Sequence, residues 1–173
     1  MIIIPARLNS SRFANKILVD IFGLPMVIRT AKQVSSLDKV VIATDTKEVY
    51  DLAKEHGFEA VMTSVDHNSG TDRINEAVNS LNLSDDEIIV NVQGDEPFID
   101  AEPLAKVIEV FRNDFDKKVD LASLMREIKD ESEINNPNNV KVVVDQSGFA
   151  LYFSRSVIPY PREVNVGVRY FQH

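Results

Sequence analysis

Residues 39–63, KVVIATDTKEVYDLAKEHGFEAVMT, decide the fold class of this chain. Two apolar runs rich in β-branched residues, 39–44 and 58–63, flank a segment that opens with helix-capping residues and stops at Gly57. His56, just before that glycine, is expected near the negative end of the helix dipole, in a capping role. The stretch therefore predicts a strand, a helix and a second, parallel strand.

The rest of the chain continues this alternation. The segments predicted as strands are 1–4, 39–44, 58–63, 87–93, 119–124, 140–145 and 149–154, and the other predicted helices are 25–37, 71–81 and 101–113. The early strands are apolar throughout, as expected where helices cover both faces of a sheet. We therefore expect an α/β fold with a doubly wound, mostly parallel sheet.

The later residues 140–154, VKVVVDQSGFALYFS, have a different pattern. Two apolar runs meet at Gln146, Ser147 and Gly148, which is typical of a hairpin, so we expect an antiparallel addition to the parallel core. The alternating apolar residues Phe149, Leu151 and Phe153 are expected to face either a core or a partner subunit.

Length and charge narrow the function classes. The 173 residues are 44% hydrophobic, which suits one globular domain with a core, here taken as residues 1–173. The net charge of -8 argues against nucleic acid and anionic membranes as partners. There is no cysteine, which excludes thiolate metal sites, and the apolar start of the chain is too short for a signal or a membrane span. These features predict a cytoplasmic protein with a small partner.

A basic loop follows the first predicted strand in PARLNSSRFANKIL, residues 5–18. Arg7, Arg12 and Lys16 occur there before the first acidic residue, Asp20, and two serines supply neutral donors. Because ligands of open α/β sheets bind beyond the carboxyl ends of the strands, this composition predicts a phosphate site. A solvated loop whose cations pair with acids elsewhere is the alternative. The chain has neither a P-loop nor a G-x-G-x-x-G motif, which weakens ATPase and dinucleotide-oxidoreductase interpretations.

A second polar segment, NVQGDEPFI at 91–99, follows another predicted strand. Asp95 is expected at the same sheet edge as the basic loop, where a carboxylate opposite phosphates implies an intervening cation such as Mg²⁺. The alternative is that Gly94 and Asp95 simply form a turn and that Glu96 is solvated.

A third polar segment, TSVDHNSGTDRINEA at 63–77, leads into a helix. Gly70 allows close approach, and Ser69, Thr71 and Asp72 offer donors and acceptors suited to reading a base. The alternatives are that Thr71 or Asp72 is an ordinary N-cap and Arg73 a surface residue. We expect a structural or solvated role for the lone His67 and do not assign it to the site.

Together these stretches resemble the 3-deoxy-D-manno-octulosonate (Kdo) cytidylyltransferases. The matching segments are 4–18, 44–77, 91–99, ALYFSRSVIPYPRE at 150–163 and YFQH at 170–173. The resemblance implies a nucleotide-sugar-transferase fold that couples CTP and Kdo to CMP-Kdo, with release of pyrophosphate in a Mg²⁺-dependent reaction. It also implies a homodimer, built in part through residues 140–162.

Residue roles carried over by position follow from the resemblance alone. It implies catalytic roles for Arg7, Lys16 and Asp95, with Asp95 binding the metal. Residues implied to contact CTP are Ala6, Arg7, Ser11, Arg12, Lys16, Ser69, Gly70, Thr71, Asp72, Arg73 and Gln93. Those implied to contact the sugar acid are Gln93, Pro97 and His173.

Two departures from the family pattern stand out. Ala14 and Asn15 occupy places where many relatives have proline and glycine, but asparagine tolerates positive φ, so Asn15 is expected to make the turn. The chain also stops where relatives continue into a part that carries a second metal-binding aspartate, so we expect it to be a fragment. Two alternatives to the function implied by the resemblance are a cytidylyltransferase for another sugar acid, such as sialic acid, and an inactive nucleotide-binding module.

Overall fold

Strand β1 (Ile2–Ala6) is the centre of the first sheet and is buried along its whole length. The computed structural model describes residues 1–8, 15–162 and 167–173, and the chain divides into two compact units, Met1–Phe115 and Asp116–His173.

The sheet of the first unit has four parallel strands in the order β3-β2-β1-β4. Its other strands are β2 (Val40–Thr44), β3 (Glu59–Met62) and β4 (Val90–Asn91). Helix α2 (Lys47–Glu55) connects β2 to β3, and His56 is its C-cap residue. The strand–helix–strand unit predicted from residues 39–63 and the capping position of His56 are confirmed.

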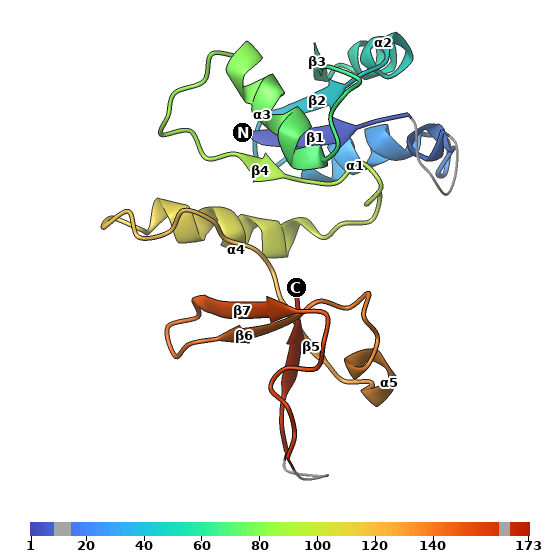
Figure 1. The fold of residues 1–173 in the computed structure, drawn as a ribbon. Coiled ribbons are helices and arrows are strands. Elements are labelled where there is room, and N and C mark those ends of the chain that lie inside the picture. Colours follow the sequence, from blue (N-terminus) through green and yellow to red (C-terminus); the bar gives the residue numbers. More distant parts are fainter. Residues whose placement is uncertain (9–14, 163–166) are drawn as a thin grey trace. The chain divides into compact units, whose positions relative to one another are not determined.

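Helices cover both faces of this sheet (Figure 1). Helices α1 (Met26–Val34), α2 and α4 (Ala101–Arg112) contribute buried side chains to one apolar cluster, together with the side chains of Ile2 and Ile4. Helix α3 (Gly70–Ser80) covers the opposite face through Ile74 and Ala77, which pack with Ile3. The predicted doubly wound arrangement is confirmed, and it explains why β1 is apolar on both sides.

The strand order places a topological switch point between β1 and β4. The chain runs from β1 outward to β2 and β3 and then returns to the other side of β1 to form β4. In open α/β sheets, the crevice beyond the carboxyl ends of the two strands at such a point is the usual ligand site. The basic loop leaves β1 at this edge, and the NVQGDEPFI segment leaves β4 there.

The second unit is built on a separate antiparallel sheet in the order β5-β8-β6-β7. Its elements are β5 (Arg126–Ile128), α5 (Glu131–Ile134), β6 (Lys141–Val144), β7 (Ala150–Ser154) and β8 (Tyr170–Gln172). The predicted hairpin is present as β6 and β7. The Asp145 carboxylate closes its turn by accepting hydrogen bonds from the backbone N–H groups of Ser147 and Phe149.

The strand expected at 119–124 is absent from that segment. The nearby strand is β5, two residues further along, where Arg126–Ile128 pairs with β8. Leu121 is 88% exposed. An apolar run forms a strand only where a neighbouring strand offers backbone partners, and the C-terminal strand offers them to 126–128.

A buried lysine fastens the hairpin to the loop before it. Lys141 is fully buried, and its ammonium donates to the backbone carbonyls of Asn136, Asn139 and Arg155 at 2.7–3.0 Å. The three carbonyl dipoles satisfy the charge inside the unit.

Across both units, the described helices include none that is long and apolar enough to cross a membrane.

Candidate functional site

The basic loop leaves the central strand at the switch point. Ala6 is buried at the end of β1, Arg7 is exposed directly after it, and Lys16 begins a short 3₁₀ helix, η1 (Lys16–Leu18). Asn15 has φ 57°, in the left-handed region, and so makes the turn expected of it. The predicted contact residues Ser11 and Arg12 lie outside the described residues.

Lys16 and Asp95 meet across the switch point. The Lys16 ammonium donates to a carboxylate oxygen of Asp95 at 2.7 Å, and each side chain is 43% exposed. The two motifs that the sequence predicts at one sheet edge are therefore in direct contact. Because both groups stay accessible to solvent, a ligand that carries phosphate and a cation can reach them.

Tight packing fixes the backbone just before Asp95. A Cβ on Gly94 would lie 3.2 Å from the carbonyl oxygen of Pro5, so the turn after β4 sits directly against β1. The Thr30 hydroxyl of α1 donates to the Gly94 carbonyl at 3.2 Å. The Asp95 carboxylate is thus presented by a backbone held from two sides.

Asp95 and Glu96 bring two neighbouring carboxylates to this corner. Burial, together with the neighbouring charge of Asp95, raises the pKa of Glu96. Within the described residues no group of three or more His, Cys, Asp and Glu side chains could hold a metal. Mg²⁺ commonly binds through one or two carboxylates plus substrate phosphates, and an accessible aspartate beside a basic loop fits that pattern. Pro97, two residues after Asp95, is buried.

The N-terminus of α3 is the third segment of the candidate site, beside the basic loop after β1 and the segment after β4. Ser69 is the N-cap: its hydroxyl oxygen accepts from the Asp72 backbone N–H at 3.1 Å, and the hydroxyl donates to the Asp72 carboxylate at 2.7 Å. The N-cap is therefore Ser69, and neither Thr71 nor Asp72 has that role. Thr71 is exposed in the first turn, where free backbone N–H groups favour anionic or acceptor groups.

Gly70 brings this segment against the other two segments. A Cβ at Gly70 would lie 3.3 Å from Cγ of Pro5 and 3.7 Å from the Gln93 amide nitrogen. Gln93 is exposed, and its amide nitrogen donates to the Asn91 side chain at 3.1 Å. The ends of β1 and β4 and the start of α3 are thus in contact at one point, as the three motifs require.

Arg73 is turned inward, away from solvent. It is 2% exposed, and its guanidinium donates to the Asp45 carboxylate at 2.8 Å and to the Thr63 hydroxyl. The surface position offered as an alternative for Arg73 is wrong, and its contact with a nucleoside stays a prediction. Asp45 was not among the predicted site residues, although its place directly after β2, at the same sheet edge, was a signal for it.

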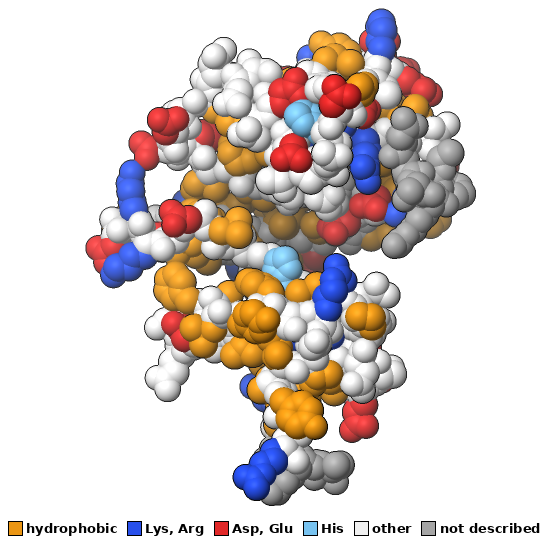
Figure 2. Space-filling view, in the orientation of Figure 1, with side chains coloured by type: hydrophobic (Ala, Val, Ile, Leu, Met, Phe, Trp, Pro, Cys, Tyr) orange, Lys and Arg blue, Asp and Glu red, His pale blue; other side chains and the backbone are white. Residues whose placement is uncertain are grey.

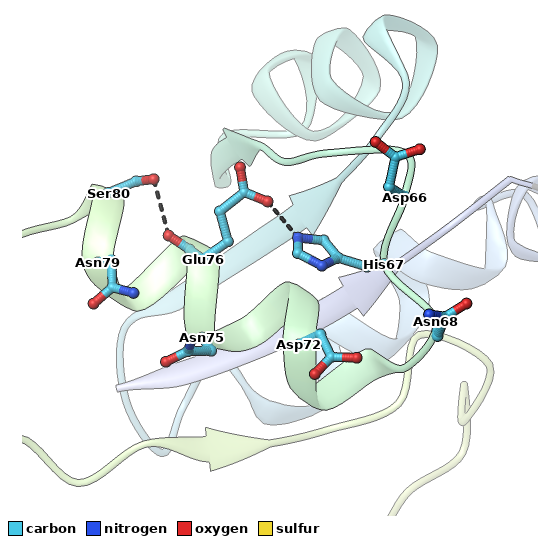
Figure 3. A pocket seen from close by; sticks show the side chains of 8 residues that line it. All are labelled: Asp66, His67, Asn68, Asp72, Asn75, Glu76, Asn79 and Ser80. Carbon is cyan, nitrogen blue, oxygen red and sulfur yellow. Dashed lines mark hydrogen bonds and ion pairs between the residues drawn. The ribbon is translucent and has the colours of Figure 1, made fainter.

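His67 and Glu76 lie in a polar hollow of about 690 Å³ beside α3 (Figure 3). The His67 ring pairs with the Glu76 carboxylate, which also accepts from the Ser64 backbone N–H at 2.8 Å. The Ser64 N–H, aided by His67, lowers the pKa of Glu76. The structural role expected for His67 is confirmed, whereas Glu76 was missed because its partners come from a loop nine to twelve residues away.

His173 belongs to the second unit. It follows β8, its backbone N–H donates to the Val140 carbonyl at 3.0 Å, and its exposed ring meets Phe153 edge-to-face with the ring centres 5.2 Å apart. Its predicted contact with the sugar acid stays a prediction.

Comparison with known proteins identifies the family. The family model described as cytidylyltransferase matches residues 1–173. The 3-deoxy-manno-octulosonate cytidylyltransferase of Flavobacterium johnsoniae is 58% identical over an alignment of 174 positions, which covers 99% of this chain and 70% of that relative. The enzyme of the same name from Francisella tularensis subsp. tularensis is 45% identical over 180 residues, covering 99% of this chain and 71% of the relative.

A solved structure agrees with these matches. The structure of CMP:2-keto-3-deoxy-manno-octonic acid synthetase complexed with CTP is 40% identical, with a TM-score of 0.89 over 99% of this chain and 70% of that one. The sequence matches and the shared fold lead to one conclusion: this chain belongs to the 3-deoxy-manno-octulosonate cytidylyltransferase family.

Proposed function

We propose that this chain transfers the cytidylyl group of CTP to 3-deoxy-D-manno-octulosonate, forming CMP-Kdo and pyrophosphate. The observation that carries the proposal is the contact between Lys16 and Asp95 at the switch point. It joins a phosphate-binding cation to a metal-binding carboxylate in a chain 58% identical to an enzyme of that name. The fold of the CTP complex, shared with a TM-score of 0.89, supports the same nucleotide.

The triphosphate is assigned to the basic loop. Arg7 and Lys16, together with Arg12 outside the described residues, would hold the phosphate oxygens, since guanidinium groups grip them in pairs and an ammonium acts as a point charge. Asp95 would hold Mg²⁺, because its carboxylate is 43% exposed and lies against Lys16. When bound there, Mg²⁺ would neutralise charge on the phosphate oxygens.

The reaction needs no covalent enzyme intermediate. The anomeric hydroxyl oxygen of Kdo forms a bond to the α-phosphorus of CTP, the bond from that phosphorus to the bridging oxygen breaks, and pyrophosphate departs with the electron pair. The hydroxyl proton is released to solvent. Lys16 and Arg7 would stabilise the charge that spreads over the phosphate oxygens in the transition state, a fixed electrostatic contribution.

The nucleoside is assigned to the wall formed by α3 and the end of β4. Ser69, Gly70, Thr71 and Gln93 offer hydrogen-bonding groups beside a surface where Gly70 allows close approach. Ala6, Asp72 and Arg73 are nearby members of the predicted contact set.

The remaining assignments are also proposals. Contact with the sugar acid is proposed for Gln93 and Pro97 of the first unit and, separately, for His173 of the second unit. We propose a homodimer through 140–162, a cytoplasmic location because CTP is supplied there, and a role in lipopolysaccharide biosynthesis, where CMP-Kdo is the activated sugar donor.

The test is formation of pyrophosphate and CMP-Kdo when the chain is mixed with CTP, Kdo and Mg²⁺. The Flavobacterium johnsoniae relative serves as the positive control, and sialic acid as a competing acceptor. We expect product with Kdo and little with sialic acid. Absence of product from a chain that circular dichroism shows to be folded would refute the proposal, and CTP binding without turnover would identify a nucleotide-binding module instead.

A further inference from the structure

Two side chains of α3 hold residues 63–69, the segment that leads into the N-terminus of that helix. On the inner side, the buried Arg73 donates to the Thr63 hydroxyl, where that segment starts. One turn later, Glu76 accepts from the Ser64 backbone N–H at 2.8 Å and pairs with the His67 ring. Figure 3 shows the Glu76 side chain reaching from the helix to His67 on the loop.

We propose that Glu76 is a positioning residue for nucleotide binding, acting through loop 64–69 on Ser69 and Gly70. The inference rests on the proposed function, because the role that it assigns to Glu76 is to hold the segment proposed to contact CTP. It deepens that function by naming what sets the geometry of the nucleoside wall.

The loop depends on polar anchors because it contributes little to the core. Val65 is 71% exposed, and Asp66 and Asn68 are exposed as well. Apolar burial therefore cannot fix its conformation, and hydrogen bonds must do so. The Glu76 carboxylate supplies two of them through a single oxygen atom.

Displacement of this loop would reach the ligand directly. Its last residue, Ser69, caps α3, and the next, Gly70, packs on Pro5 and next to Gln93. A Gly70 shift of a few tenths of an ångström changes the gap between the start of α3 and the ends of β1 and β4. A misplacement of substrate-binding groups by about 1 Å can cost an enzyme about 100-fold in rate. The loss of a residue that positions such groups should therefore have a measurable effect.

A carboxylate suits this position better than other side chains. It accepts both hydrogen bonds in its charged form, and the Ser64 N–H together with His67 lowers the pKa of Glu76, so that this form persists. An amide retains acceptor capacity without the charge, and alanine retains neither. The two replacements therefore form a graded series.

The experiment compares Glu76→Ala and Glu76→Gln with a control, Glu55→Ala, which removes an exposed carboxylate from α2. KM for CTP, KM for Kdo and kcat are measured for each variant. We expect KM for CTP to rise about tenfold in Glu76→Ala and about threefold in Glu76→Gln, the scale of losing charged and then neutral hydrogen bonds. We expect kcat to change less than about threefold, and KM for Kdo and the control variant to stay at wild-type values.

A second readout does not involve catalysis. Hydrogen exchange of the Ser64 and Asp72 amides is measured without nucleotide, and both amides should exchange faster in Glu76→Ala than in Glu55→Ala. If protection is unchanged, or if KM for CTP stays at the wild-type value while thermal stability falls, Glu76 does not position the loop and the inference is wrong. If Glu76→Ala does not fold, Glu76→Gln decides on the same criteria.

Failure of the proposed function would look different. If the wild-type chain binds CTP but releases no pyrophosphate, the function fails, and calorimetric CTP affinities of the same variants then decide whether Glu76 positions the loop. If the wild-type chain binds no CTP at all, both proposals are refuted, although the amide-exchange result still reports on the loop itself.

Discussion

The Lys16 ammonium and the Asp95 carboxylate form an ion pair of 2.7 Å, although 79 positions of sequence separate them. Both side chains are 43% exposed, and exposed ion pairs contribute little to stability. The pair is therefore better explained by what it offers a ligand than by what it adds to the fold. Substituting either residue should change activity far more than stability.

Lys16→Ala should lower kcat about 100- to 1000-fold, the usual effect of removing one group that stabilises transition-state charge. Initial rates of pyrophosphate release at saturating CTP and Kdo would measure it. Lys47→Ala, which removes an exposed lysine paired with Asp51 on α2, is the matched control and should keep wild-type kcat. If kcat of Lys16→Ala decreased by less than about threefold, the catalytic role proposed for Lys16 would be wrong.

Asp95→Asn should abolish the dependence of CTP binding on Mg²⁺, because an amide is a much poorer ligand than a carboxylate for this cation. Calorimetric titrations of wild type and variant, each with Mg²⁺ and with a chelator, would show it. In the wild type, chelation should stop turnover, and added Mg²⁺ should restore it. Equal enhancement of CTP binding by Mg²⁺ in both proteins would contradict the assignment of Asp95 as the metal ligand.

The sequence pattern predicted the backbone well and the side-chain partners poorly. Hydrophobic periodicity was sufficient for the first unit, and the rule that parallel strands share a carboxyl edge was sufficient to bring Lys16 and Asp95 together. Glu76 was missed because its pairing with the Ser64 N–H depends on how a loop folds back along a helix. The expected strand at 119–124 was wrong because propensity does not specify which segment finds a partner strand.

Gly70→Ala should weaken CTP binding, because the added methyl group would lie 3.3 Å from Pro5 Cγ and 3.7 Å from the Gln93 amide nitrogen. The proline ring has little freedom to move, so we expect KM for CTP to rise about tenfold through misplacement of the α3 N-terminus.

Gly57→Ala is an informative contrast. It has φ +81° and open space around it, so it should lower stability by about 1 kcal/mol through backbone strain and leave KM unchanged. Equal KM values for both variants would contradict the tight contact at Gly70.

Asp38 should make stability depend on pH in the acid range. Burial acts to raise its pKa, but the Lys39 N–H and the Met1 ammonium outweigh burial and lower the pKa from its ordinary 3.8. A lowered folded pKa means that the ionised group stabilises the fold above its unfolded pKa and loses this contribution as the pH falls through the folded value. Asp38→Asn should therefore melt at a lower temperature than wild type near neutral pH, with the difference shrinking below pH 3.8. Melting curves across the acid range would test this, and a difference independent of pH would contradict it.

The exposed apolar side chains of β7 should mediate association between two copies of the chain. Leu151 and Tyr152 are 65% and 62% exposed, and β7 lies at an edge of its sheet. Figure 2 shows apolar side chains gathered over the strands of the second unit. A charge placed on such a surface would have to be desolvated in an interface, so Leu151→Asp should convert a dimer to a monomer.

Light scattering coupled to size-exclusion chromatography would measure the mass. Leu121→Asp, at a residue 88% exposed but outside β7, is the matched control and should leave the dimer intact. A wild-type chain that is monomeric at all concentrations, or a Leu151→Asp variant that stays dimeric, would show that β7 is not the interface.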